Sequence, residues 1–114
     1  MQSSTAVRAQ RVDLSFPLCF TGEDGVERKG NCLNISESGI MASFAEELDL
    51  WTTGLLHLSF ALSVMVVHAR VARCAERDAG LAFQFQNEGE RAAMRDFVQA
   101  AAAQSTLAGG AVPF

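Results

Sequence analysis

The chain has 114 residues, a length that suits one domain and is too short for two of ordinary size. Hydrophobic residues make up 49% of it and charged residues 19%, a balance that excludes a wholly disordered chain and a collagen-like repeat. Thirteen acidic against nine basic residues give a formal net charge of -4, so we expect no binding to DNA or RNA, whose phosphate backbones an acidic surface repels.

The first predicted element is a strand over residues 12–20, where apolar residues occupy alternate positions. Pro17 falls on the opposite face of this strand, which indicates a sheet edge or a bulge. Gly22–Gly25 has the composition of a turn, so residues 26–34 can return as a second strand. A polar loop over residues 34–38 follows.

Apolar runs and alternation predict four further strands, at residues 39–44, 55–62, 64–73 and 79–85. Two of them fall within Leu50–Ala69, which contains no Asp, Glu, Lys or Arg and has the length of a membrane span. Its hydroxyl groups and its histidines, His57 and His68, disfavour a helix in lipid, so we expect no membrane insertion. Trp51 is expected to cover the core near a loop; an exposed indole would instead suit a partner surface.

After residue 87 the apolar period changes to that of a helix, predicted from Glu88 to about Ala103. Asn87 is the expected N-cap, and Glu90 can reach back to it as in a capping box. Residues 104–114 contain two glycines and a proline and are expected to form a mobile tail. Six short strands followed by one helix predict a mainly β fold, a six-stranded antiparallel barrel with a C-terminal α-helix, because closure removes exposed sheet edges.

Three cysteines, at positions 19, 32 and 74, form no C-x-x-C pair and are expected to be buried, reduced thiols. The two histidines lie at no familiar metal-site spacing from them, so no metal is expected. Met1–Gln10 has no apolar run and therefore no visible signal peptide, which favours a cytoplasmic location. No G-x-S-x-G motif is present, and we expect no enzyme activity.

Two short polar motifs flank the first predicted hairpin. Arg8 and Arg11 precede it, and guanidinium groups can bind phosphate, read the O6 and N7 edge of guanine, or stack on a base. The loop Asn34-Ile-Ser-Glu-Ser-Gly39 follows it. Asn34 offers donors and an acceptor and Ser36 a hydroxyl, while Gly39 permits a left-handed turn or a close backbone approach to a ligand. Each motif alone is also typical of a solvated arm or an ordinary turn.

The ordered set of motifs resembles the PilZ domain family, six-stranded barrels that commonly bind the bacterial second messenger cyclic di-GMP. The resemblance covers about residues 8–100. The family loop [D/N]-x-S-x-x-G is matched by Asn34, Ser36 and Gly39. The family's V-x-R and G-[VL]-x-F strands are matched by Val71 and Arg73 and by Gly80, Leu81 and Phe83.

The resemblance implies that Arg8 and Arg11 clamp cyclic di-GMP and that Asn34, Ser36 and Gly39 contact it, with Arg73 as a further candidate. The implied organisation is a flexible arm over residues 1–11, the barrel and helix over 12–103, and the tail. Cyclic di-GMP would be the ligand with no other cofactor, and an unidentified effector protein would be the partner. We expect a monomer or weak dimer.

The arm departs from the family pattern, because the family has R-x-x-x-R and this chain has R-x-x-R, with Val7 where the first arginine would stand. The family also contains members that bind no nucleotide. A degenerate PilZ domain that acts as a protein–protein adapter therefore stays an alternative.

Overall fold

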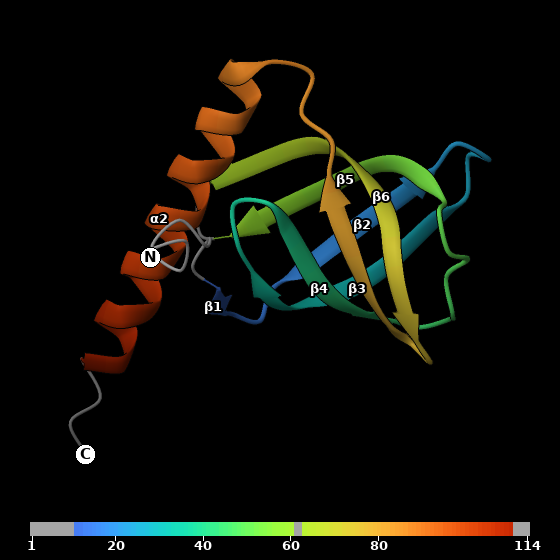
Figure 1. The fold of residues 1–114 in the computed structure, drawn as a ribbon. Helices are drawn as coiled ribbons and strands as arrows, with labels where there is room; N and C mark the ends of the chain where they lie inside the picture. The colour runs from blue at the N-terminus through green and yellow to red at the C-terminus, as the bar shows by residue number, and fades with distance from the viewer. Residues whose placement is uncertain (1–10, 61–62, 111–114) are drawn as a thin grey trace, which may run out of the picture.

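The computed structural model describes residues 11–60 and 63–110 of the chain. Seven antiparallel strands form one sheet in the order β1-β3-β2-β5-β6-β7-β4, and pairing of β3 with β4 closes it into a barrel (Figure 1). The strands are β1 (Val12–Asp13), β2 (Pro17–Gly22), β3 (Glu27–Ile35), β4 (Gly39–Phe44), β5 (Thr53–Phe60), β6 (Ser63–Ala75) and β7 (Asp78–Phe83). The two-residue β1 pairs only at the end of β3, so the predicted six-stranded barrel is confirmed.

The first predicted strand is divided into two. Leu14 and Phe16 are buried but belong to no strand, and the pairing resumes at Pro17, which opens β2. Proline has no N–H to donate to a ladder, so the first position of a strand is one of the few that accept it. The prediction of one continuous strand over residues 12–20 was therefore wrong, although the alternation of buried side chains was right.

Two β-bulges interrupt the alternation of side chains. The register shifts between Cys32 and Asn34 in β3 and between Val71 and Arg73 in β6. Cys32 and Ile35 are both 0% exposed although they are three positions apart, which strict alternation forbids and an extra residue allows. In β6, Val71 is buried and Arg73 is exposed although they are two positions apart, and strict alternation would place them on the same face. Both bulges thus direct a polar side chain away from the core.

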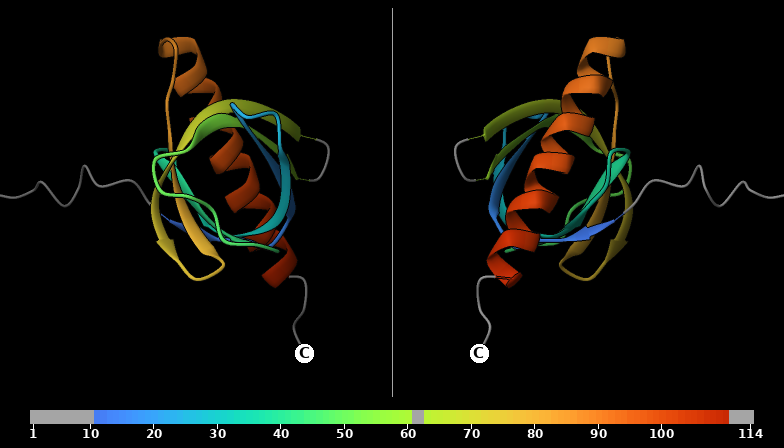
Figure 2. Two further views of the ribbon diagram at one scale, coloured as in Figure 1. Left: turned by 90° about the vertical axis from the view of Figure 1, so that its right-hand side faces the viewer. Right: turned by 90° about the vertical axis from the view of Figure 1, so that its left-hand side faces the viewer.

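Helix α2 (Glu88–Gly110) lies across one end of the barrel and closes it (Figures 1 and 2). Its first turn has the predicted cap, because the Glu90 N–H donates to Asn87 Oδ1 at 2.9 Å. Glu90 Oε1 in turn accepts from the N–H of Gln86, one residue before the expected Asn87 N–H, at 2.7 Å. The buried face of the helix consists of Met94, Phe97, Val98 and Ala101.

The helix continues beyond its predicted end. Residues 104–110, expected to belong to the tail, are helical as far as Gly110. Ala100–Ala103 is an unbroken run of the best helix-forming residue, so the helix has no reason to stop at position 103.

The uncharged stretch Leu50–Ala69 contributes to two strands rather than to a helix. Its inward side chains are buried, whereas His57 and His68 are exposed on the outer face, as predicted. In the described residues no helix has both the length and the apolar character to cross a membrane. Trp51 does not cover the core as predicted, because its side chain is 59% exposed.

The three cysteines are free, but only Cys32 is buried as predicted. Cys19 is half-buried and Cys74 is exposed. Cys74 lies near the end of β6, beyond the bulge, where the strand leaves the core.

Candidate ligand-binding site

An open hollow of about 450 Å³ lies on the outside of the barrel where β4, β7 and β6 run side by side. Two arginines from distant parts of the sequence, Arg11 and Arg73, line it together with a hydroxyl group from Ser38. Its floor consists largely of small residues, Ala72, Gly80 and Ala82. Side chains this small allow a planar ring system to approach the backbone closely.

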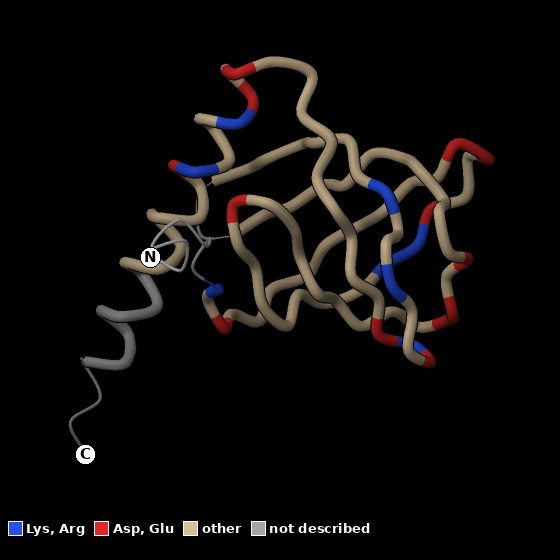
Figure 3. The backbone as a smooth tube through the Cα atoms, in the orientation of Figure 1, with Lys and Arg blue, Asp and Glu red and all other residues tan. Residues whose placement is uncertain are grey.

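The hollow is cationic although the chain is acidic. Among the described residues no carboxylate lines it: β4 and β6 contain no Asp or Glu, and Asp78, at the start of β7, is not one of the lining residues. The acidic residues lie mainly in turns and on α2 (Figure 3). Among the described residues the salt bridges join Arg28 to Asp24, Arg91 to Glu88 and Arg95 to Glu37, so neither arginine of the hollow is neutralised by one. This arrangement suits an anionic ligand.

Arg11 and Asn34, two of the residues predicted from the motifs, meet at this site. The pairing of Val12 with Ile35 places Arg11 beside the end of β3, and Arg11 Nη1 donates a hydrogen bond to Asn34 Oδ1. Asn34 lies in β3 rather than in the loop, and the bulge before it directs its side chain outward. Arg8, the other predicted clamp residue, lies outside the described residues.

Ser36 shapes the turn between β3 and β4. It is 2% exposed, its Oγ accepts from the Ser38 N–H at 3.3 Å, and its N–H donates to the Gly39 carbonyl at 2.9 Å. Its hydroxyl is therefore engaged within the turn, and Ser38 is the serine that lines the hollow. Sequence reasoning missed Ser38, for which the only signal was a second serine just before the glycine of the motif.

Gly39 is required for packing rather than for an unusual backbone angle. Its φ is not positive, so of the two possibilities that the sequence offered, the left-handed turn is not formed. A Cβ at this position would lie 2.8 Å from the carbonyl oxygen of Leu81 in β7. The glycine thus permits the close approach of β4 to β7 at the edge of the hollow.

Arg73 owes its position to the β6 bulge and to its cross-strand partner Gly80. A Cβ at Gly80 would lie 3.7 Å from Arg73 Cβ and 3.9 Å from Arg73 Nε. The missing side chain leaves the arginine free to lie across β7. Sequence reasoning offered Arg73 as a secondary candidate, and the structure places it in the same hollow as Arg11.

Behind the site, Cys32 is buried in the core. Burial raises the pKa of its thiol to about 12, and the charge of Arg11 opposes this increase only in part. The thiol is therefore neutral at physiological pH and packs in the core as a small apolar group. In the part of the chain that the structure describes, no group of three or more His, Cys, Asp or Glu side chains is placed to hold a metal ion.

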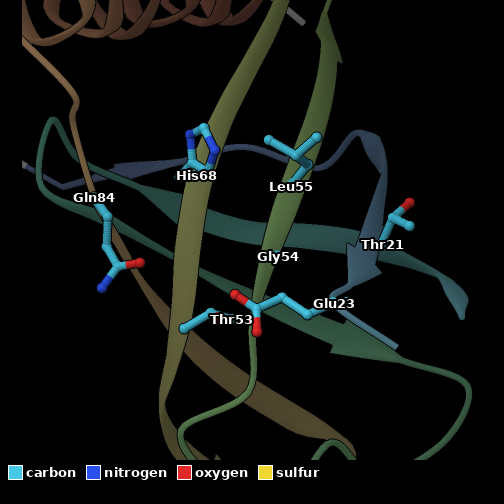
Figure 4. A pocket seen from close by; sticks show the side chains of 8 residues that line it. Thr21, Glu23, Thr53, Gly54, Leu55, His68 and Gln84 are labelled. Atoms are coloured by element: carbon cyan, nitrogen blue, oxygen red, sulfur yellow. The ribbon is translucent and has the colours of Figure 1, made fainter. Parts of the chain in front are cut away.

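A second hollow, of about 350 Å³, lies where Thr21, Glu23, His68 and Gln84 come together (Figure 4). The described residues that line it include the carboxylate of Glu23 and no lysine or arginine. This composition does not favour an anion, so the cationic hollow is the better candidate for a phosphate-containing ligand.

Comparison with known families identifies the domain. The family model described as PilZ domain matches residues 6–100. The chain belongs to the PilZ family. The match includes Arg8, Arg11, the β3–β4 turn and Arg73, so the cationic hollow lies within the PilZ domain.

Two solved PilZ domains have the same fold. One is the PilZ domain of YcgR from Escherichia coli with c-di-GMP, with 8% sequence identity and a TM-score of 0.78. The match covers 92% of this chain and 98% of the YcgR chain. The other is the PilZ domain of CeSA from a cellulose-synthesizing bacterium, 16% identical with a TM-score of 0.69 over 80% of this chain and 96% of its own. A search among curated proteins gave no significant match.

Proposed function

We propose that this PilZ domain is a receptor for cyclic di-GMP that passes the signal to a partner protein in the cytoplasm and catalyses no reaction. One observation carries the proposal: two arginines that form no salt bridge with any described residue share a hollow that no described carboxylate lines, on a chain of net charge -4. Cyclic di-GMP has two negatively charged phosphodiesters and two guanine bases, and guanidinium groups can bind both kinds of group.

The contacts suggest how the ligand would be held. Arg11 would turn from Asn34 to a phosphate or a guanine edge, which would leave the Asn34 amide free to bind the ligand as well. Ser36 and Gly39 would maintain the turn that presents Ser38. Residues 1–11 would act as an arm that closes over the ligand and brings Arg8 to it, so that binding changes the surface offered to the effector.

Isothermal titration calorimetry of the full chain with cyclic di-GMP tests this function. We expect saturable binding, and we expect Arg11→Ala to weaken it by at least about tenfold through loss of a charge-assisted contact. Arg77→Ala is the matched control, because it removes the same charge from a residue of the β6–β7 turn that does not line the hollow. No heat at high micromolar ligand, or equal losses in the two variants, would contradict the proposal.

A second candidate function is a nucleotide-independent adapter. It is favoured by the exposed apolar side chains on the outer face of the β5–β6 pair, Leu55, Val64 and Val66, which are 37%, 73% and 47% exposed. Exposed apolar groups gathered on one face are typical of protein contacts. This function predicts a folded chain that gives no calorimetric response to cyclic di-GMP and binds its partner equally well with Arg11→Ala.

A further inference from the structure

Trp51 is held in an unfavourable backbone conformation at the surface. Its φ is 72°, in the left-handed region that a bulky residue rarely occupies, and its side chain is 59% exposed. Backbone hydrogen bonds fix the conformation, because the Trp51 N–H donates to the Val71 carbonyl at 2.8 Å and the Val71 N–H donates to the Thr52 carbonyl at 2.8 Å. Strained residues of this kind gather at functional sites.

Arg70 lies against the indole of Trp51. The guanidinium carbon is 5.2 Å from the centre of the ring, and Arg70 forms no salt bridge among the described residues. Its Nε is buried without a hydrogen-bond partner. The guanidinium is therefore held by the aromatic ring and is still short of acceptors.

The pair borders the cationic hollow on the side opposite Arg11. Arg70 pairs across the sheet with Ala82, and Trp51 hydrogen-bonds to the residue before Ala72; both alanines line the hollow. Arg11 approaches from β3, and the strands β6, β7, β4 and β3 are consecutive neighbours. Three spacings of about 4.8 Å separate the two sides, which leaves room for a ligand with two purine bases.

We propose that Trp51 and Arg70 form a stacking subsite for one guanine base of cyclic di-GMP; this inference rests on the function proposed above. A base stacked on the indole face that Arg70 leaves open covers the exposed ring, while Arg70 stays on the other face and holds the ring in place through the cation–π contact. The strained conformation of Trp51 then has a role, because it holds the ring at the surface against Arg70, which lies on a strand that borders the hollow.

Trp51 is the only tryptophan of the chain, so its fluorescence reports on this subsite alone. On titration with cyclic di-GMP we expect the emission to be quenched in step with calorimetric saturation. Trp51→Gly removes the ring and suits a positive φ, so it is expected to fold. It should bind cyclic di-GMP about 5- to 150-fold more weakly, the range found when a stacking aromatic is removed.

Leu50→Ala is the control for disturbance of the same loop, because Leu50 is also exposed, at 47%, and should leave the affinity unchanged. If the wild type binds and Trp51→Gly binds within about twofold of it, the stacking subsite is wrong and the receptor function stands. If the wild type gives no calorimetric binding, the receptor function fails, and the subsite fails with it.

Discussion

Arg11 connects the surface of the barrel with its core. Its side chain donates to Asn34 at the hollow, and its charge also acts on Cys32, which is 0% exposed. That charge favours the thiolate, but loss of hydration disfavours it more strongly, so the pKa of Cys32 is raised to about 12. Cys32 therefore serves the fold as a small apolar side chain.

The raised pKa of Cys32 predicts a loss of stability at alkaline pH. The thiol of the unfolded chain releases its proton near pH 9, whereas the folded chain keeps it to about pH 12. Between these values the folded state binds more protons, so its stability falls as the pH rises. From pH 8 to pH 10 the wild type should lose about 1 kcal/mol more of its free energy of unfolding than Cys32→Ala does.

Urea unfolding at the two pH values measures this difference. The cavity left by the substitution does not depend on pH, so the comparison rests on the change between pH values. The chain has no tyrosine and only one lysine, Lys29, and its other two thiols, Cys19 and Cys74, are present in both the wild type and the variant, so their effects cancel in the comparison. If the free energy of unfolding falls equally in the wild type and in Cys32→Ala, burial does not hinder ionisation of the Cys32 thiol in the folded chain, contrary to this prediction.

At the scale of elements, α2 closes the barrel, and its start is fixed by side-chain hydrogen bonds. Asn87 accepts from the N–H of Glu90, while Glu90 accepts from the N–H of Gln86. These bonds set the angle at which the helix leaves β7 and allow Phe97 to meet Phe16 edge to face, with ring centres 6.3 Å apart.

Asn87→Ala should lower the free energy of unfolding by about 1 kcal/mol, because an N–H of the first turn loses its acceptor. Thermal and urea unfolding followed by circular dichroism measure the change. Gln99→Ala is the control, since Gln99 is exposed on the same helix and outside the first turn. A loss no greater than that of the control would mean that the cap adds nothing to stability.

An element could be predicted from the sequence where its own residues show the pattern of buried and exposed side chains, without reference to a neighbouring strand. The alternation in β5 and β6 and the N-terminal cap of α2 could be predicted in this way. The bulges before Asn34 and Arg73 could not, because they depend on the pairing of two strands. The motifs likewise predicted Arg11 and Asn34 as site residues. The contact between Trp51 and Arg70 could not be predicted, because it depends on the backbone hydrogen bonds that align Trp51 with β6.

For the whole molecule, the net charge conceals an uneven distribution. Acidic residues lie mainly in turns and on α2 (Figure 3), and among the described residues no carboxylate lines the hollow that contains Arg11 and Arg73. A small dianion can reach this hollow without meeting the acidic regions. A long nucleic acid extends past the hollow, and its remaining phosphates would face those regions.

The charge distribution therefore predicts selection by size. At physiological ionic strength the chain should bind cyclic di-GMP, and a fluorescently labelled single-stranded RNA should show no change in anisotropy when the protein is added. Added salt should weaken the binding of cyclic di-GMP, because the exposed arginines are screened over a Debye length of about 8–10 Å at these concentrations. Saturable RNA binding that cyclic di-GMP displaces would show that the hollow accepts phosphates of any chain length, contrary to this prediction.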